Sequence, residues 1–487
     1  MSLRHEATQA AFWGIAQKWG HHGVRLCVFV VLARLLGPDS FGLVALASVF
    51  ILLGETLVDQ GFGEALVQRE RIGRAHLDSA FWATVVTGVA LAGLAVAAAP
   101  LIAAVFGQPD LGPVLAGLAP SLILASLCRV QESMLRRALV FRKVAGISLL
   151  STGVGGVAGL AVAFTGGGVW SLVVQFLVQR AVQLPCLWLA VDWWPRARFS
   201  PPHFRALLRF GANVMGINVL NFANRQADHL LIGYVLGPTA LGYYTIAYRL
   251  IRILFDLLPQ AVTPVAFAAF SRLQREPARL REAFYEATQA IALFAFPAFT
   301  GLAILAPAII PACFGPGWAA SVPVLQVLAP IGMLQSLSVL YQASIKAVGR
   351  PGHAFGITAA NAVANVIGFS IAVQWGVVAV ALAYSVRGFL LWPVSWGVLR
   401  RAFGPGAGRY AASLATPFGA TVAMAAAVVA ARPWLLSPSH EPLTGVIAGV
   451  PLGVATYLLA LVMIAPDLCR HVWRRLARRT HASGVRP

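Results

Sequence analysis

The sequence is poor in charged residues, and acidic side chains are the scarcest among them. Only 11% of the 487 residues are charged, and 17 of those are Asp or Glu. An ordinary soluble protein carries about 25% charged residues. Hydrophobic residues make up 59% of the chain, and the mean hydropathy is +0.76. This composition excludes a soluble globular protein and indicates an all-α polytopic membrane protein.

Cysteines and catalytic motifs are also scarce. Neither a disulfide framework nor a metal-ligand spacing is formed by the five isolated cysteines, which are Cys27, Cys128, Cys186, Cys313 and Cys469. The sequence has no nucleotide-binding loop, pair of catalytic carboxylates or nucleophile motif. We therefore expect a protein that is not an enzyme, uses no cofactor and binds no metal.

Apolar runs of about 20 residues, the length that crosses a bilayer, recur fourteen times along the chain. They are centred near residues 24, 52, 92, 123, 155, 179, 220, 250, 298, 334, 364, 387, 422 and 455. The N-terminus carries Lys18, His21 and His22 where a secretory signal needs an apolar core, so the first span is expected to stay attached.

The predicted organisation has two lobes of six helices, two additional helices and a tail. A segment rich in proline, tryptophan and arginine separates the lobes and suits a cytoplasmic linker. The predicted bounds are 1–191 for the first lobe, 192–205 for the linker, 206–401 for the second lobe, 402–467 for the two additional helices and 468–487 for the basic tail.

The net charge of +20 is explained by where the basic residues lie, so it does not require a nucleic-acid partner. Of the 37 Lys and Arg residues, 27 fall in the termini and in alternate loops. The intervening loops hold only Arg34 and Arg432. By the positive-inside rule, both termini are expected to be cytoplasmic.

Two predicted spans near the middle of the chain carry polar stripes. Asn218, Asn221, Arg225 and Asp228 follow at steps of three, four and three, which places them on one helix face. After a short turn, every fourth residue is again polar, in the series Tyr244, Tyr248, Arg252 and Asp256. A charged residue at mid-span costs about 2.5 to 3.5 kcal/mol on insertion scales, so such a stripe is a candidate functional site.

The turn between these spans repeats an earlier one. Leu236–Gly242 (LGPTALG) matches Leu36–Gly42 (LGPDSFG) at an offset of 200 residues, and the same offset relates Arg225 to Arg25. We interpret this as an internal duplication. Transporters are often built from such repeats, with the binding site at their interface.

Four segments together resemble a known family. They are Ala33–Ser48 (ARLLGPDSFGLVALAS), Gly61–Glu70 (GFGEALVQRE), Arg225–Leu250 (RQADHLLIGYVLGPTALGYYTIAYRL) and Ala347–Pro351 (AVGRP). They are similar to the polysaccharide transporter family, the O-antigen flippase-like proteins within the multidrug, oligosaccharidyl-lipid and polysaccharide exporter superfamily. The likeness covers roughly residues 5 to 400 and is greatest to the lipopolysaccharide or exopolysaccharide biosynthesis exporters.

The resemblance implies a V-shaped pair of pseudo-symmetric six-helix bundles around a central cavity, with two extra helices. It implies a flippase in the bacterial inner membrane that moves undecaprenyl-diphosphate-linked oligosaccharide from the cytoplasmic to the periplasmic leaflet by alternating access. The implied partners are this lipid-linked glycan, the phospholipid bilayer, and polysaccharide polymerase and assembly proteins. The resemblance does not choose a glycan.

The candidate binding residues follow from a surplus of basic side chains in the spans, eight against five acidic ones. Arginine offers paired donors to phosphate oxygens. We hypothesise that Arg25 and Arg225 clamp a diphosphate. The assisting groups would be Arg252, Arg249 and Lys18 for the diphosphate, and Asn218, Asn221, Tyr244 and Tyr248 for sugar hydroxyls.

The acidic residues leave a second interpretation open. Glu55, Asp59 and Asp228 can only balance the arginines, or they can carry protons or a cation that couples transport to a gradient. Spacing predicts a local pair between Arg129 and Glu132, and Arg180 is expected to reach the inner membrane surface.

Two other functions remain as alternatives. A multidrug cation exporter of the same superfamily should have an acid-rich cavity, whereas the surplus here is basic. An integral-membrane glycan polymerase or ligase usually needs a sizeable outer loop, and only residues 432–442 offer one.

Overall fold

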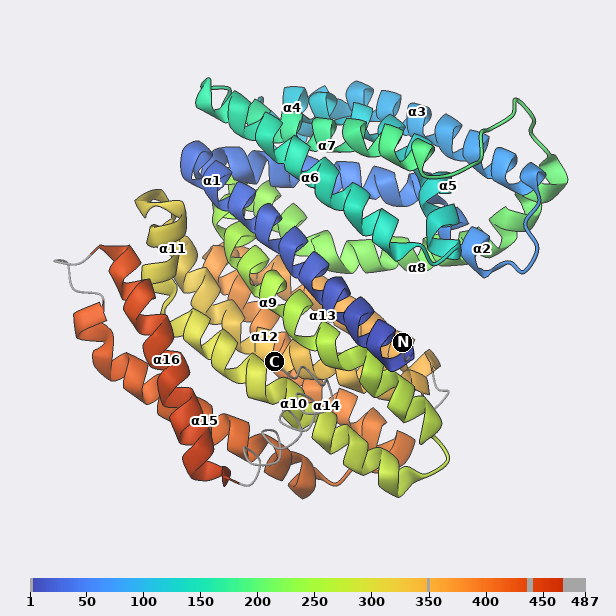
Figure 1. The fold of residues 1–487 in the computed structure, drawn as a ribbon. Coiled ribbons are helices and arrows are strands. Elements are labelled where there is room, and N and C mark those ends of the chain that lie inside the picture. The colour runs from blue at the N-terminus through green and yellow to red at the C-terminus, as the bar shows by residue number, and fades with distance from the viewer. Residues whose placement is uncertain (1–2, 348–350, 436–440, 467–487) are drawn as a thin grey trace, which may run out of the picture. The chain divides into compact units, whose positions relative to one another are not determined.

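The computed structural model describes residues 3–347, 351–435 and 441–466, and these form helices without any strand (Figure 1). Side chains are described within those ranges except at 3–22, 210, 213, 258–261, 264–265, 351–355 and 357–359, so the Lys18 side chain and the tail at 468–487 lie outside the description. The first group of helices is α1 (Leu3–Asp59), α2 (Phe62–Gln68), α3 (Arg74–Val105), α4 (Leu111–Leu118), α5 (Pro120–Arg137), α6 (Phe141–Phe164), α7 (Trp170–Leu189) and α8 (Pro201–Val235). The second group is α9 (Gly237–Arg272), α10 (Pro277–Ile304), α11 (Ala306–Phe314), α12 (Ser321–Ala347), α13 (Pro351–Ala372), α14 (Val377–Phe403), α15 (Ala407–Leu435) and α16 (Pro442–Ile464).

The all-α membrane class is confirmed. Among the described residues, ten helical segments are long and apolar enough to cross a membrane. Each of the fourteen predicted centres falls inside a helix, the first two within the two parts of α1. The centres near residues 220, 250 and 364 fall in α8, α9 and α13, which are not among the ten segments. The two polar stripes lie on α8 and α9. The count of fourteen spans stays a prediction.

The duplicated turns share one backbone geometry. Gly37 interrupts α1 with a φ of 75°, and Gly237 begins α9 with a φ of 82°. Both lie in the left-handed region that glycine adopts without steric cost. Each glycine precedes a proline, and Figure 1 shows α1 changing direction along its length. The repeat found in the sequence is therefore also a repeat of local structure.

The chain forms two compact units. The first contains Met1–Thr245 with Asn365–Val377, and the second contains Ile246–Ala364 with Val378–Pro487. These units group α8 and the start of α9 with the N-terminal helices, rather than dividing the chain at the linker. The predicted lobes and their bounds stay predictions.

Small residues let the helices of the first unit approach closely. A Cβ atom at Gly155 would lie 2.8 Å from the Gln175 carbonyl oxygen of α7, and one at Gly159 would lie 3.0 Å from that of Ser171. Since apolar surface gains nothing by leaving lipid, close van der Waals packing of this kind holds membrane helices together. Helix α3 of the same unit has an exposed apolar surface. Val86, Leu94 and Leu101 are exposed by 65%, 62% and 67%, as lipid-facing side chains would be.

The second unit has an aromatic core. Tyr341 and Tyr410 are buried and hydrogen-bonded to each other, and the Trp392 indole N–H donates to the Tyr341 hydroxyl at 3.0 Å. The Phe284 and Tyr410 rings stack at 6.1 Å. Buried polar ends are thus satisfied within the cluster, as burial of hydroxyl and indole groups requires.

Candidate functional site

A polar cavity of about 360 Å³ lies within the first unit, between α1, α5 and α8. Its lining residues are Leu52, Glu55, Thr56, Asp59, Arg129, Asn218, Asn221, Phe222, Arg225 and Gln226. Most of these side chains are polar, although all belong to helices built of apolar sequence. A polar cavity among membrane helices is a site at which charged groups can be retained.

The α8 side of this cavity is the stripe that the sequence predicted. Asn218, Asn221 and Arg225 line it together, as their spacing indicated. Arg225 is exposed, and no hydrogen bond or ion pair joins it to any residue in the described ranges. Its guanidinium group is therefore available to a ligand.

The α1 side carries two carboxylates, and each is paired with an arginine. The Arg180 Nη2 atom donates to Glu55 Oε1 at 2.6 Å. The Arg129 Nε atom lies 3.1 Å from Asp59 Oδ1, and the two groups form an ion pair without a hydrogen bond between these atoms. Side-chain exposure is 25% for Arg180, 26% for Arg129 and 12% for each acid, so both pairs are largely removed from solvent.

One sequence-based prediction is wrong. Glu132 accepts from Arg136 at 2.6 Å, one helical turn away, and Arg129 lies against Asp59 of α1, so the predicted local pair of Arg129 with Glu132 does not form. Arg180 pairs with Glu55 of α1, and its predicted approach to the inner membrane surface stays a prediction. For both arginines the carboxylate partner lies on another helix, where sequence spacing is no guide.

The charges around the cavity leave one cation uncompensated. Two of the arginines, Arg129 and Arg180, each have a carboxylate partner. Arg225 is the third, and it has none among the described residues. Arg225 is therefore the group in this cavity at which an anion could bind.

Asp228, the last residue of the α8 stripe, does not line the cavity and is buried against Tyr244 of α9. It is 3% exposed, and its carboxylate accepts from the Tyr244 hydroxyl at 2.8 Å and from the backbone N–H of His229 at 2.8 Å. The His229 Nδ1 atom lies 2.9 Å from the same carboxylate. Tyr244 is fully buried by this arrangement and does not line the polar cavity.

The other predicted site residues lie outside the cavity. Arg25 is exposed on α1 and has interactions of its own. In the second unit, Arg252 contacts Asp256 through Nε at 3.1 and 3.2 Å, and the Tyr248 ring lies 6.3 Å from that of Tyr384. Arg249 also has an interaction of its own. The structure brings together only part of the predicted set.

Five cavity residues were missed as site residues, namely Leu52, Thr56, Arg129, Phe222 and Gln226. One signal was present in the sequence. Glu55 and Asp59 are spaced by one helical turn, and two acids on one apolar helix each need a cationic partner. Arg129 and Arg180 were among the basic residues counted in other spans, but they were assigned to Glu132 and to the membrane surface instead.

Sequence comparison gives relatives named for the biosynthesis of lipopolysaccharide, succinoglycan and teichuronic acid. The lipopolysaccharide biosynthesis protein WzxC of Escherichia coli is 27% identical over 343 residues, which are 69% of each chain. The succinoglycan biosynthesis transport protein ExoT of Rhizobium meliloti is 32% identical over 66% of this chain and 65% of its own. The teichuronic acid biosynthesis protein TuaB of Bacillus subtilis is 28% identical over 91% of this chain and 92% of its own.

Solved structures share the fold at low sequence identity. The lipid II flippase MurJ, in an inward closed conformation, matches with a TM-score of 0.76 and 15% identity over 93% of this chain and 99% of its own. An inward-facing multidrug resistance transporter of the MATE family matches with a TM-score of 0.61 and 16% identity over 81% of this chain and 94% of its own. Residues 31–323, more than half of the chain and including the whole polar cavity, match the model of the family described as polysaccharide biosynthesis protein. This chain is a member of that family.

Proposed function

We propose that this protein is a flippase that moves undecaprenyl-diphosphate-linked oligosaccharide from the cytoplasmic to the periplasmic leaflet of the bacterial inner membrane. The observation that carries the proposal is Arg225, an uncompensated cation in a polar cavity between membrane helices. The relatives named for lipopolysaccharide, succinoglycan and teichuronic acid support a glycan substrate.

The chemistry of the cavity suits a diphosphate. A guanidinium group donates two parallel hydrogen bonds to phosphate oxygens, and these are stronger where water is sparse. Asn218 and Asn221, on the same side of the cavity, supply amide donors and acceptors for further oxygens. At about 30 Å³ for each non-hydrogen atom, 360 Å³ holds roughly a dozen atoms, enough for a diphosphate but not for a whole glycan.

In this proposal, the predicted residues that lie outside the cavity contact the substrate at another stage of transport. Arg25 is exposed, and Lys18, Arg249, Arg252 and Tyr248 would approach the substrate when the protein changes conformation. In this scheme the diphosphate is held first by Arg225 and then shared with Arg25.

The proposed mechanism is alternating access. With both termini in the cytoplasm and fourteen spans, the two duplicated turns lie at the periplasmic end. Their mutual contact, in which the Thr239 hydroxyl donates to Asp39 at 2.9 Å, would close that end while the cytoplasmic side is open. Separation of the turns would then release the glycan outward.

The test is transfer of a fluorescent undecaprenyl-diphosphate sugar across proteoliposome membranes, read by an impermeant quencher. Arg225→Ala is expected to slow transfer at least tenfold, and Arg225→Lys to retain part of it because the charge remains without the planar fork. Arg275→Ala, at an exposed arginine with no described partner, is the matched control.

Unchanged transfer by a well-folded Arg225→Ala protein would remove Arg225 from the site. Failure of the intact protein to transfer this lipid, together with export of an organic cation, would instead support the multidrug alternative.

A further inference from the structure

The turn that ends α1 separates two cavities of opposite character. Asp59 lines the polar cavity, and the next residue, Gln60, lines a second cavity of about 630 Å³. Gln60 and Gly61 both have left-handed backbones, with φ of 48° and 68°. Left-handed backbone at a residue other than glycine is uncommon, and such strain clusters at functional sites. The two consecutive side chains are thereby directed to different cavities.

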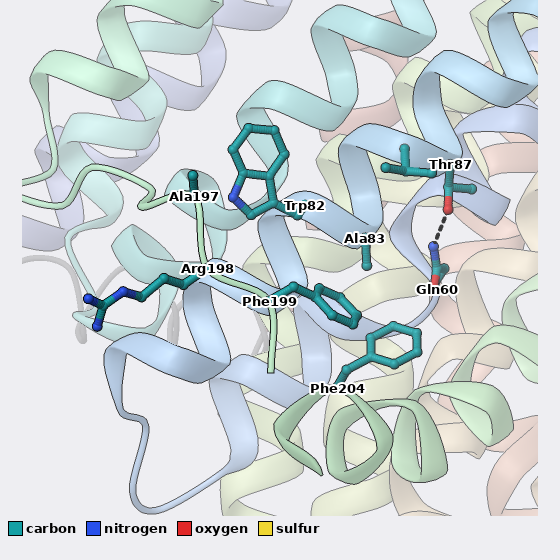
Figure 2. A pocket seen from close by; sticks show the side chains of 9 residues that line it. Gln60, Trp82, Ala83, Thr87, Ala197, Arg198, Phe199 and Phe204 are labelled. Atoms are coloured by element: carbon teal, nitrogen blue, oxygen red, sulfur yellow. Dashed lines mark hydrogen bonds between the residues drawn. The ribbon is translucent and has the colours of Figure 1, made fainter. Parts of the chain in front are cut away.

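The second cavity is mostly apolar, with six of its nine lining residues apolar (Figure 2). It lies among α3, the linker before α8 and the first turn of α8, and its walls include Trp82, Ala83, Val86, Phe199 and Phe204. Figure 2 shows the Arg198 guanidinium group pointing away from the aromatic rings, so the stem of that side chain contributes to the wall.

Two of the polar side chains at its edge donate hydrogen bonds within the protein. The Gln60 side-chain amide donates to the Thr87 hydroxyl at 2.6 Å, and the Trp82 indole N–H donates to the Arg196 carbonyl oxygen at 2.7 Å. A ligand here would find little to hydrogen-bond except the Arg198 head at the rim. The cavity is therefore suited to hydrocarbon.

The cavity continues into the lipid-facing surface of α3. Val86 belongs to both, since it lines the cavity and is 65% exposed. Along the same helix Val89, Leu94 and Val96 are exposed by 49%, 62% and 50%. A hydrocarbon chain that begins in the cavity can thus leave along an apolar surface into the bilayer without crossing polar atoms.

The divider between the two cavities is rigid. A Cβ atom at Gly61 would lie 2.4 Å from the Gly211 carbonyl oxygen of α8, and one at Gly211 would lie 2.4 Å from the Gln60 carbonyl oxygen. The two backbones can come this close only because both residues are glycines, without a Cβ atom. The turn is held against α8, which itself supplies Arg225 to the polar cavity and Phe204 to the apolar one.

We propose that the apolar cavity holds the part of the carrier lipid's hydrocarbon chain nearest to the diphosphate, while the diphosphate lies with Arg225 on the other side of the Asp59–Gln60 turn. This inference rests on the proposed function and adds the site of the lipid chain to it. At about 30 Å³ for each non-hydrogen atom, 630 Å³ accommodates roughly twenty carbons, so the rest of a longer chain would lie along α3.

The position of the cavity favours this occupant over a bulk phospholipid. A phospholipid needs only an apolar surface with a basic rim, which many parts of a membrane protein provide. Here the apolar cavity and the uncompensated cation flank one turn of two residues. An amphiphile with its charge at one end of a long hydrocarbon chain matches that pairing.

The experiment compares the binding of geranyl diphosphate and geranylgeranyl diphosphate, of ten and twenty carbons, to the purified protein in detergent. We expect the longer chain to bind at least tenfold more tightly, since each buried methylene strengthens binding about fourfold before losses to the micelle. Ala83→Phe takes up part of the cavity and should abolish this gain while leaving the affinity for inorganic pyrophosphate, which has no hydrocarbon chain, unchanged.

Two further variants serve as a control and as a second change to the cavity wall. Ala97→Phe makes the same change at an exposed site on α3 and should keep the tenfold gain. Phe199→Ala removes a wall ring without overpacking and should reduce the gain severalfold, so the proposal can be tested even if Ala83→Phe does not fold.

The outcomes separate this inference from the proposed function. If Arg225→Ala weakens both ligands while Ala83→Phe and Phe199→Ala keep the full chain-length gain, the diphosphate site stands and the chain site is overturned. If native mass spectrometry shows that Ala83→Phe loses a copurified phospholipid but keeps the gain, the cavity is a membrane-lipid site. If Arg225→Ala binds geranyl diphosphate normally, the diphosphate site fails.

Discussion

Thr239 donates a hydrogen bond of 2.9 Å to the carboxylate of Asp39, and the two residues are 200 positions apart in the chain. The glycines of the same two turns pack reciprocally. A Cβ atom at Gly42 would lie 1.6 Å from the Pro238 carbonyl oxygen, and one at Gly242 would lie 2.0 Å from that of Pro38. Equivalent positions of the two repeats therefore contact each other across a local two-fold relationship.

If these turns separate during transport, joining them should stop it. We expect the Asp39→Cys, Thr239→Cys double variant to form a disulfide on mild oxidation and to lose most of its flipping activity, which a reductant restores. Each single cysteine variant is the control. Full activity in the oxidised double variant would show that the turns remain together throughout transport.

The same contact predicts a sharp difference between glycines. Gly242→Ala places a methyl group against backbone that cannot turn aside, so a loss of about 1 to 3 kcal/mol in stability is expected. Gly216→Ala, in α8 with nothing within 4 Å, should be neutral or slightly stabilising because alanine favours helix. Thermal unfolding in detergent measures both, and equal behaviour of the two variants would contradict the close packing.

The Glu55 and Arg180 pair should contribute to stability as a coupled unit. Removing one member leaves a charge largely withdrawn from solvent, which for fully buried pairs costs about 3 to 5 kcal/mol. With Arg180 one-quarter exposed, we expect about 1 to 3 kcal/mol for Glu55→Ala or Arg180→Ala, and less than the sum for the double variant. A double-mutant cycle by thermal unfolding checks this, and additive losses would argue against the pair.

Among the three acids considered for ion coupling, Asp228 differs in its partners. Glu55 and Asp59 have arginine partners, whereas Asp228 accepts from Tyr244 and His229. Asparagine at this position keeps an oxygen that can accept from Tyr244 but cannot take up or release a proton. If a proton gradient accelerates transport by the intact protein, we expect that acceleration to be at least tenfold smaller in Asp228→Asn.

Proteoliposomes with an imposed pH difference measure this effect, and Asp110→Asn, at an exposed aspartate, is the matched control. An undiminished response in Asp228→Asn would remove Asp228 from coupling. No response in the intact protein would remove proton coupling altogether.

Local patterns explain what could be predicted about the site. Asn218, Asn221 and Arg225 were placed on one face because helical spacing alone determines it, and all three line the cavity. Asp228 lies on the same face, about 20° around the helix from Asn221, but about two turns further along, where the neighbouring helix α9 buries it against Tyr244.

The sequence by itself determined the membrane class, the helices and the duplicated turn, because these depend on composition, on apolar runs and on glycine and proline at fixed positions. The sequence could not show which charged residues, far apart in the chain, form ion pairs. Asp59 and Arg129 are 70 residues apart, Glu55 and Arg180 are 125 apart, and only helix packing brings them together. Tertiary structure alone decided which arginine was left without a carboxylate, because that depends on which charges the other helices bring within a few ångströms.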